Sequence, residues 1–318
     1  MLHFEDGFFD EEIKCDFRIS AAMKCAWAAQ LEVLDRVDRI CRKHGIRYFA
    51  FWGTLLGAVR HQGFIPWDDD IDICMTRENY MDFLTVAGEE LPEEYAVLNI
   101  YREEQYENSF TRVTNGREIN FSKEHLREYH GCPFIVGIDI FPLDYLSCDE
   151  EKLAYQQKIM GIIKNMISLA KFVEKNENDP EKTLIVEESR SSLKEGIRAL
   201  EEALDWNTDP GRTDLNRLRQ LFDMACMMSN ETEADYVTSM PEYTDGQPLR
   251  IPKSCFGEAE MVFEGCKIKV PEDYDTVLRI LFGDYMVPVR TGSGHDYPFY
   301  KDQLEILHSK GIWLDKSE

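Results

Sequence analysis

The sequence lacks the features that define several large classes of protein. Its 318 residues contain no apolar run of the roughly 18 residues that a membrane span needs, so we expect no transmembrane segment. The first residues, MLHFEDGFFDEE, are acidic and unlike a signal peptide. The nine cysteines include no C-x-x-C pair and no Cys/His cluster with zinc spacing. We therefore expect reduced thiols and a cytoplasmic protein.

Positive charge is also scarce. Lys and Arg total 36 against 60 Asp and Glu, which gives a formal net charge of −24. A chain of this charge repels nucleic acid and anionic membranes unless it carries a local basic patch, so nucleic acid is not an expected partner. An anionic nucleotide would be repelled too, so a bound metal and a few placed cations would have to attract it. Apolar residues make up 43% of the chain, which is ample for a core.

The most informative stretch is residues 46–76. Residues 46–52 form an apolar, aromatic run that predicts a buried strand. The pair Gly53-Thr54 interrupts this run, and residues 55–61 suit one or two helical turns. A Gly/Pro turn follows, and then a second predicted strand that carries acidic residues.

These acidic residues suggest a metal site. Asp68, Asp70 and Asp72 are two residues apart, so on a strand they share one face, while Ile71 and Ile73 point to the core. Neighbouring carboxylates repel each other and are costly to desolvate, and a cation offsets both effects. Hard oxygen ligands suit Mg²⁺. The alternative is a solvated acidic turn, but the apolar strands on both sides favour a metal site.

A further acid lies in a second apolar stretch. Residues 134–141 form an apolar run with one acid, Asp139, and a lone carboxylate in a buried strand needs a partner. The partner that we expect is a metal held by Asp70 and Asp72. The alternative is an edge-strand carboxylate in water, which the apolar surroundings disfavour. The next acid, Asp144, follows a proline and is expected in a turn.

Periodicity predicts the remaining elements. Helical spacing of apolar residues and suitable capping residues predict helices at 20–44, with Gly45 as the C-cap, and at 76–90. Further strands are expected at 96–101 and 110–114, long helices at 150–175, 184–205 and 213–229, a hairpin around Glu264-Gly265, and a helix at 271–282.

These elements predict four parts of the chain. We expect an N-terminal arm at residues 1–19, a catalytic core at 20–148, a helical insertion at 149–235, and a C-terminal hairpin and helix at 236–318 that complete the catalytic unit. The helical insertion contains no recognisable motif, and its expected role is structural.

The motifs resemble a known family. The stretch GTLLGAVRHQGFIPWDDDIDI, residues 53–73, resembles the LicD family of phosphocholine transferases, to which the fukutin-type ribitol-phosphate transferases are related. It also resembles the broader nucleotidyltransferase signature of a Gly-Thr turn, a spacer, and acid-apolar-acid-apolar. An acid followed by Phe-Pro near residue 139 and the order Phe-Glu-Gly…Gly-Asp-Tyr at 263–285 extend the similarity. The resemblance implies an α/β (α+β) fold with a small mixed sheet flanked by helices and an inserted helical subdomain.

The resemblance also implies a reaction. A CDP-alcohol such as CDP-choline would donate its phosphoalcohol group to a hydroxyl of a glycan or small molecule, as in lipopolysaccharide or teichoic acid modification. Asp70 and Asp72 would hold Mg²⁺ or Mn²⁺. Asp139 would ligate the same metal site and take the proton of the hydroxyl. Asp68 and Asp69 would lie next to these ligands without binding the metal themselves.

Phosphate and alcohol binding would need further residues. Gly53 and Thr54 would let backbone N–H groups and a hydroxyl approach the phosphate. The cations expected to bind phosphate are Arg60, Arg112, Lys253 and His295, with Arg279 and Arg290 as further candidates. For each cation the alternative is an ordinary surface charge. Trp52, Trp67 and Tyr297 are candidates for an aromatic cage around a quaternary ammonium group.

Two other functions fit the same motifs. The first is a nucleotidyltransferase that places a nucleoside monophosphate on a small molecule or protein. The second is an inactive nucleotide-binding protein of the same fold, against which the intact acids at 70, 72 and 139 argue.

Overall fold

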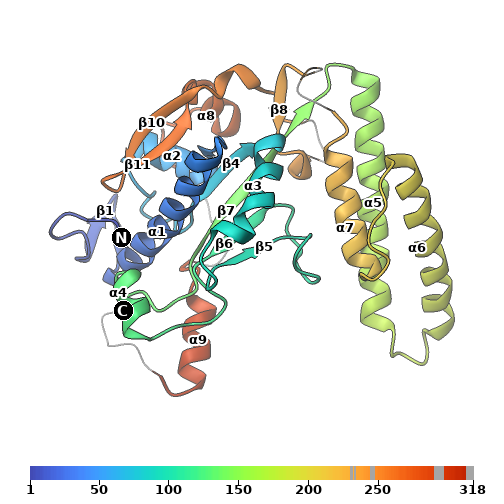
Figure 1. Cartoon of the computed structure of the whole chain (residues 1–318), viewed down its shortest axis with the longest axis horizontal. Coiled ribbons are helices and arrows are strands. Elements are labelled where there is room, and N and C mark those ends of the chain that lie inside the picture. The colour runs from blue at the N-terminus through green and yellow to red at the C-terminus, as the bar shows by residue number, and fades with distance from the viewer. Residues whose placement is uncertain (230–231, 233, 244–247, 290–296, 313–318) are drawn as a thin grey trace. The chain divides into compact units, whose positions relative to one another are not determined.

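The chain forms two compact units. The computed structural model describes residues 1–229, 232, 234–243, 248–289 and 297–312. Unit 1 comprises Met1–Val97, Thr111–Pro142 and Ser254–Glu318, and unit 2 comprises Leu98–Phe110 and Leu143–Lys253 (Figure 1). The predicted acids at 70, 72 and 139 all belong to unit 1.

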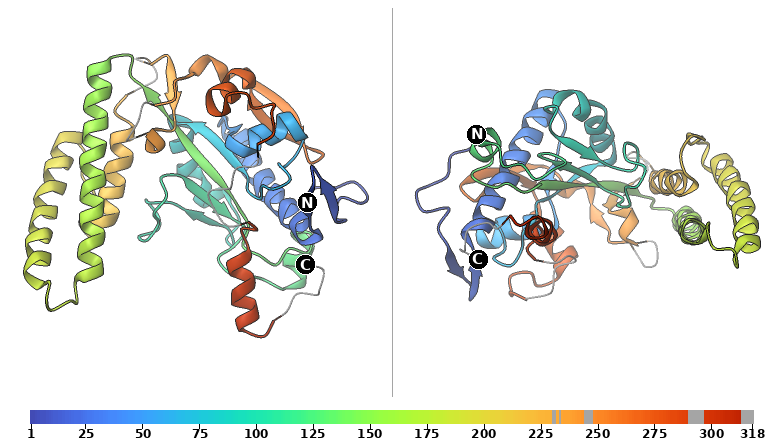
Figure 2. Two further views of the ribbon diagram at one scale, coloured as in Figure 1. Left: turned by 180° about the vertical axis from the view of Figure 1, so that it is seen from behind. Right: turned by 90° about the horizontal axis from the view of Figure 1, so that it is seen from below.

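Unit 1 is built on a central sheet. Its strand order is β3 (Phe49–Ala50), β4 (Asp72–Thr76), β7 (Gly137–Leu146), β6 (Thr111–Thr114) and β5 (Ala96–Leu98). β3 is antiparallel to β4, and β6 is antiparallel to β7. Helices α3 and α9 lie on opposite faces of this sheet (Figure 2). The mixed α/β architecture with a sheet flanked by helices confirms the predicted fold class.

The first long helix follows its local signals. Helix α1 (Ala21–His44) begins after Ser20, whose hydroxyl accepts a hydrogen bond from the Met23 N–H at 3.2 Å. It ends at Gly45, which adopts a left-handed φ of 68°. Both ends match the prediction, because capping residues act within a few positions of their own place in the chain. Helix α3 (Arg77–Glu90), after Thr76, is confirmed as well.

The region around Gly53-Thr54 differs from the prediction. Helix α2 (Trp52–His61) already includes both residues, and the preceding strand is only the short β3. The Leu55 N–H donates to the Phe51 carbonyl at 3.1 Å, so the first helical turn starts before Gly53. The predicted interruption is therefore wrong: Gly53 and Thr54 lie in the first turn of a helix.

The acidic stretch also differs from the prediction. Strand β4 begins only at Asp72, so Asp68 and Asp70 precede it and do not share a strand face with it. The side-chain amide of Gln30 on α1 donates to the Asp69 carbonyl at 2.7 Å, so the backbone at Asp69 is held by a helix. We call residues 68–71 the acidic loop.

Strand β7 is longer than predicted. It runs through Pro142 to Leu146, and Asp144 lies in it, buried, opposite Thr238 of β8 (Tyr236–Thr238). The expectation of a turn at Asp144 is wrong. Pro142 falls between the residues that pair with β6 and those that pair with β8, so its missing N–H removes no bond from either ladder.

The rest of unit 1 surrounds the sheet. The predicted hairpin and the helix after it are confirmed as β10 (Glu258–Phe263), β11 (Cys266–Pro271) and α8 (Tyr274–Phe282). The other elements of this unit are β1 (Glu12–Lys14), β2 (Phe17–Ile19), α4 (Lys123–Glu128) and α9 (Lys301–Ser309). The predicted N-terminal arm thus contains a small antiparallel hairpin, β1–β2.

Unit 2 is mainly helical. Helices α5 (Glu150–Asn176), α6 (Thr183–Leu204) and α7 (Asp214–Cys226) pack around a shared apolar core, and their bounds lie close to those predicted. The strands β8 and β9 (Ile251–Pro252) and the short turns η2 (Met240–Tyr243) and η3 (Lys253–Cys255) follow. Within the described ranges of the chain, no helix has both the length and the apolar character that crossing a membrane requires.

Candidate active site

The acidic loop gathers three carboxylates. Asp68, Asp69 and Asp70 each offer one oxygen within 4.8 Å of the others. Asp69 is fully buried, and its Oδ2 accepts a hydrogen bond from the Phe299 N–H at 2.6 Å. Asp68 and Asp70 are only partly buried. Asp69 thus fixes the loop to the C-terminal segment, while its two neighbours remain within reach of solvent.

The electrostatic environment of Asp72 is strongly perturbed. Burial raises the pKa of Asp72 well above its ordinary value, and the charges of Asp70, Asp139 and Asp68 raise it further. Only the Arg112 guanidinium acts in the opposite direction among the main causes. The structure therefore places Asp72 within electrostatic reach of the two acids that the sequence pairs with it.

Asp139 has a partner that the sequence did not predict. Arg112 donates from Nε to Oδ1 and from Nη2 to Oδ2 of Asp139, each at 2.6 Å. The two residues lie opposite each other on β6 and β7, so the strand register brings them together. The expectation that a metal must be the partner of Asp139 is corrected in this respect. The edge-strand alternative is also excluded, because Asp139 is 6% exposed on a strand between β4 and β6.

Backbone bonding joins the two acidic segments. The Asp139 N–H donates to the Ile71 carbonyl at 2.9 Å, which connects β7 to the last residue of the acidic loop. Ile71 and Ile73 are fully buried, as predicted. The contact therefore fixes Asp139 beside the start of β4, where Asp72 lies.

The N-terminus of α2 meets these acids. The Asp72 N–H donates to Thr54 Oγ1 at 2.8 Å, and Thr54 is buried. A Cβ at Gly53 would lie 2.3 Å from Asp68 Oδ2, so any larger residue would force this carboxylate to move away from the helix. A helix N-terminus carries unpaired N–H groups and a partial positive charge that favours anions. Gly53 and Thr54 thus lie where a phosphate could meet both the helix and the acids.

Two of the other predicted phosphate ligands, Arg60 and Arg279, bond to groups outside the acidic loop. Arg60, in the last turn of α2, donates from Nη1 to the Tyr285 carbonyl at 2.9 Å, so it joins α2 to the segment after α8. Arg279 pairs with Asp275 on the exposed side of α8. Lys253 belongs to unit 2, at the start of η3. His295 and Arg290 lie outside the described residues. Phosphate binding by these four predicted cations and by Arg290 stays a prediction.

Two of the predicted aromatic residues share a neighbour. The Phe17 ring of β2 lies 6.4 Å from the Trp67 ring and 5.3 Å from the Tyr297 ring, measured between centroids. Burial raises the pKa of Tyr297, and the charges of Tyr300, Asp69 and Asp68 raise it further. These three partly buried rings therefore lie beside the acidic loop. Trp52 instead contacts Phe282 of α8, at 6.4 Å.

Sequence reasoning missed one residue that holds this region in place. Glu264, in the turn of the β10–β11 hairpin, accepts a hydrogen bond from the Phe64 N–H at 3.0 Å, and its own N–H donates to the Gln62 carbonyl at 2.9 Å. A Cβ at Gly63 would lie 2.0 Å from Glu264 Oε1. The Phe-Glu-Gly triplet marked Glu264 in the sequence, but nothing in the triplet identifies its partner.

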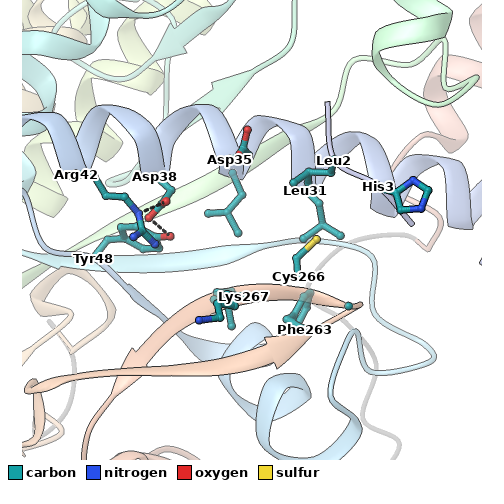
Figure 3. Close-up of a pocket in the computed structure, with 13 residues that line it drawn as sticks. Leu2, His3, Leu31, Asp35, Asp38, Arg42, Tyr48, Phe263, Cys266 and Lys267 are labelled. Carbon is teal, nitrogen blue, oxygen red and sulfur yellow. Dashed lines mark hydrogen bonds and ion pairs between the residues drawn. The ribbon is translucent and has the colours of Figure 1, made fainter. Parts of the chain in front are cut away.

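Unit 1 also contains a pocket of about 330 Å³ between α1 and the β10–β11 hairpin (Figure 3). Asp38, one of the residues that line it, accepts hydrogen bonds from Arg42 at 2.5 Å and from Tyr48 at 3.0 Å. The residues that line this pocket include none of the predicted site residues. Because Asp38, Arg42 and Tyr48 already bond to one another and no predicted site residue lines this pocket, we assign the candidate site to the acidic loop.

Comparison with known proteins defines the class of this domain. Residues 45–143 match the model described as LicD/FKTN/FKRP, nucleotidyltransferase domain. This range runs from the end of α1 to β7 and includes α2, the acidic loop, Arg112 and Asp139. This part of the chain thus resembles the nucleotidyltransferase domain of the LicD/FKTN/FKRP family.

Individual relatives agree with this assignment. The chain is 48% identical over 65 residues to the lipopolysaccharide cholinephosphotransferase LicD of Haemophilus influenzae, which covers 20% of this chain and 24% of that protein. It is 32% identical over 89 residues to the ribitol 5-phosphate transferase FKRP of Mus musculus and of Homo sapiens, over 28% of this chain and 18% of theirs. The matches therefore span about a quarter or less of these relatives.

Proposed function

We propose that the protein is a metal-dependent transferase that moves a phosphoalcohol group from a CDP-alcohol donor to a hydroxyl of a glycan or small molecule. The observation that carries the proposal is Asp72, whose backbone N–H donates to Thr54 in the first turn of α2 and whose pKa is raised by the charges of three other carboxylates. This arrangement lies within the part of the chain that matches the LicD/FKTN/FKRP domain. The names of the relatives, which transfer cholinephosphate or ribitol 5-phosphate, support a phosphoalcohol as the group transferred.

The acids fit a divalent cation. Their electrostatic repulsion raises the pKa of Asp72, and one guanidinium cannot neutralise all of them. Carboxylate oxygens are the ligands that Mg²⁺ and Mn²⁺ prefer. Asp70, Asp72 and Asp139 would hold the ion, with Asp68 beside them. When bound, the ion would neutralise the pyrophosphate and stabilise charge on its oxygens.

The chain's own residues would orient and activate the substrates. The N–H groups at the start of α2 would bind the donor phosphate, which the absence of a side chain at Gly53 allows to come close. Asp139 would accept the proton of the attacking hydroxyl through one of its two oxygens. The rings of Phe17, Trp67 and Tyr297 next to the acidic loop favour a cationic alcohol such as choline, since ring faces and carboxylates both attract an ammonium group.

An isotope experiment tests the reaction without knowledge of the acceptor. The protein is incubated with CDP-choline and Mg²⁺ in water enriched in ¹⁸O, so that water replaces the acceptor hydroxyl, and the products are examined by phosphorus NMR and mass spectrometry. Attack on the choline-bearing phosphorus puts the label in phosphocholine and releases unlabelled CMP. We expect this pattern in Mg²⁺, no turnover in excess EDTA, and none for Asp72→Asn.

Other outcomes would identify the alternatives. Label in CMP would mean attack on the nucleoside phosphorus, which defines a nucleotidyltransferase. Full turnover in EDTA would exclude metal dependence. Binding of CDP-choline without turnover, either with water or with hydroxyl-bearing glycans, would identify an inactive nucleotide-binding protein.

A further inference from the structure

Both oxygens of Asp139 are occupied by one residue. Arg112 donates to Oδ1 from Nε and to Oδ2 from Nη2, each at 2.6 Å. A bidentate bond between guanidinium and carboxylate takes one lone pair of each oxygen and brings a positive charge to the place where a cation or a proton would bind. While this bond persists, Asp139 therefore binds a cation less well and is a weaker proton acceptor than the proposed function requires.

The two partners differ in exposure. The Asp139 side chain is 8% exposed and is fixed on an interior strand, whereas the Arg112 side chain is 46% exposed. An arginine side chain has several rotatable bonds, so its guanidinium can leave while its strand stays in place. Because the register of β6 and β7 does not change with the rotamer, a displaced Arg112 remains beside the site.

The charges around Asp72 favour a second partner for the Arg112 guanidinium once a cation and a pyrophosphate are bound. Asp70, Asp139 and Asp68 all act on Asp72 with negative charge, and Arg112 is the cation among its main influences. A divalent cation bound by these carboxylates would replace the charge that Arg112 supplies and would repel it. A pyrophosphate at the N-terminus of α2 would at the same time offer the guanidinium a new bidentate partner.

We propose that Arg112 is an exchangeable partner of Asp139. Arg112 neutralises the Asp139 carboxylate in the ligand-free protein, and it moves to the donor's phosphate when a divalent cation binds at Asp139. The inference rests on the proposed function, because it requires the cation and the donor. It predicts that the cation and the donor bind cooperatively, and each must then tighten the other by the same factor.

Removal of the guanidinium should therefore have opposite effects on the two ligands. The affinity for Mn²⁺ is measured from the electron paramagnetic resonance of free Mn²⁺, with and without a methylene-bridged analogue of CDP-choline that cannot react. A protein-free titration corrects for Mn²⁺ bound by the analogue. For Arg112→Gln we expect Mn²⁺ alone to bind about tenfold more tightly, since a competing positive charge is gone. At fixed Mn²⁺ the analogue should bind about tenfold more weakly.

Two variants serve as controls. Arg112→Lys keeps the charge but cannot form the bidentate bond, so it should bind Mn²⁺ as the wild type does and bind the analogue more weakly. It also provides the test if Arg112→Gln, which leaves a buried carboxylate without its partner, does not fold. Arg39→Gln removes an exposed cation that pairs with Asp35 on α1, and it should change neither affinity.

The inference is wrong if Arg112→Gln weakens Mn²⁺ binding, or if both folded Arg112 variants bind the analogue as tightly as the wild type. Either result would leave the proposed function intact as long as the wild type binds Mn²⁺ and cleaves CDP-choline. If the wild type binds no Mn²⁺, the proposed function fails and this inference fails with it.

Discussion

The carboxylate of Glu264 accepts a hydrogen bond from the backbone N–H of Phe64 at 3.0 Å, across 200 positions of sequence. The Phe64 ring also stacks on Trp27 of α1, with ring centroids 4.5 Å apart. The segment that leads into the acidic loop is therefore held from two sides, by the β10–β11 hairpin and by α1. Glu264 is thus a positioning residue: it holds Phe64, and the acidic loop begins four positions later, at Asp68.

Glu264→Ala should lower activity more than Glu264→Gln. Alanine removes the acceptor and leaves the Phe64 N–H without a partner, a loss of about 1–3 kcal/mol in the free energy of unfolding. The acidic loop would then lose a support, and we expect kcat to fall by about tenfold while KM changes less. Glutamine keeps a carbonyl oxygen at the same place and should restore most of kcat. Equal losses in kcat for the two variants would show that the negative charge, and not the hydrogen bond, is what matters.

The stability of the protein should respond to pH through Glu264. Burial is the main cause that raises the pKa of Glu264, against the lowering effects of Lys24 and the Phe64 N–H. A carboxyl group whose pKa is higher in the fold stabilises it at low pH, and this contribution is lost as the pH rises from about 4 through the raised pKa. Glu264→Gln has no such loss. Urea unfolding of both proteins at several pH values should show the variant gaining on the wild type as pH rises, and a constant difference would contradict the assignment.

Asp72→Asn should abolish turnover and leave the metal-free protein as stable as the wild type or more so. The pKa of Asp72 is raised by burial and by three neighbouring carboxylates, so its charged form is unfavourable in the fold. Asparagine removes that charge and with it an expected metal ligand. Thermal melting in EDTA gives the stability, with Asp82→Asn on the exposed face of α3 as the control. Unfolding of the metal-free variant would mean that Asp72 is structural.

Gly53→Ala should impair the site and spare the fold. The new Cβ would lie 2.3 Å from Asp68 Oδ2, and that carboxylate can move away because it ends a flexible side chain. We expect at least a tenfold loss of activity and a small change in melting temperature. Gly161→Ala on α5 is the control, since a Cβ there meets nothing within 4 Å and should stabilise the helix by about 0.5–1 kcal/mol. Full activity of Gly53→Ala would show that the close approach to Asp68 is not needed.

Asp139→Ala should lower kcat on the order of a thousandfold, because it removes an expected metal ligand and the proton acceptor. The affinity for the donor should fall less, since Asp70 and Asp72 remain. Steady-state kinetics with CDP-choline separates the two effects. A variant that keeps wild-type kcat would exclude Asp139 from the chemistry, and the Arg112–Asp139 pair would then be purely structural.

Features that depend on nearby residues were predictable from sequence. Helix α1 starts at Ser20 and stops at Gly45 as expected, since capping acts locally. The loop at Asp68 and Asp70 was not predictable, because the hydrogen bond that holds its backbone comes from Gln30, on a helix 39 positions away.

The candidate site shows the same division. The alternation of acids with Ile71 and Ile73 predicted that these two isoleucines are buried, but not that Asp69 is buried as well. The pairing of Arg112 with Asp139 depends on the register of β6 against β7, which no single-strand pattern specifies. Glu264 and Gly63 needed a contact between segments 201 positions apart, and sequence spacing carries no information on such contacts.

The acidic loop is supported by residues that the ribosome adds late. Glu264 holds the approach to it, and the Phe299 N–H binds Asp69 within it. A nascent chain that has reached only β7 already contains every acid of the candidate site, but it has neither support. A chain that ends at β7 should therefore hold the acidic loop less firmly than one that extends past Phe299, although Gln30 and Asp139 already bond to the backbone of the loop.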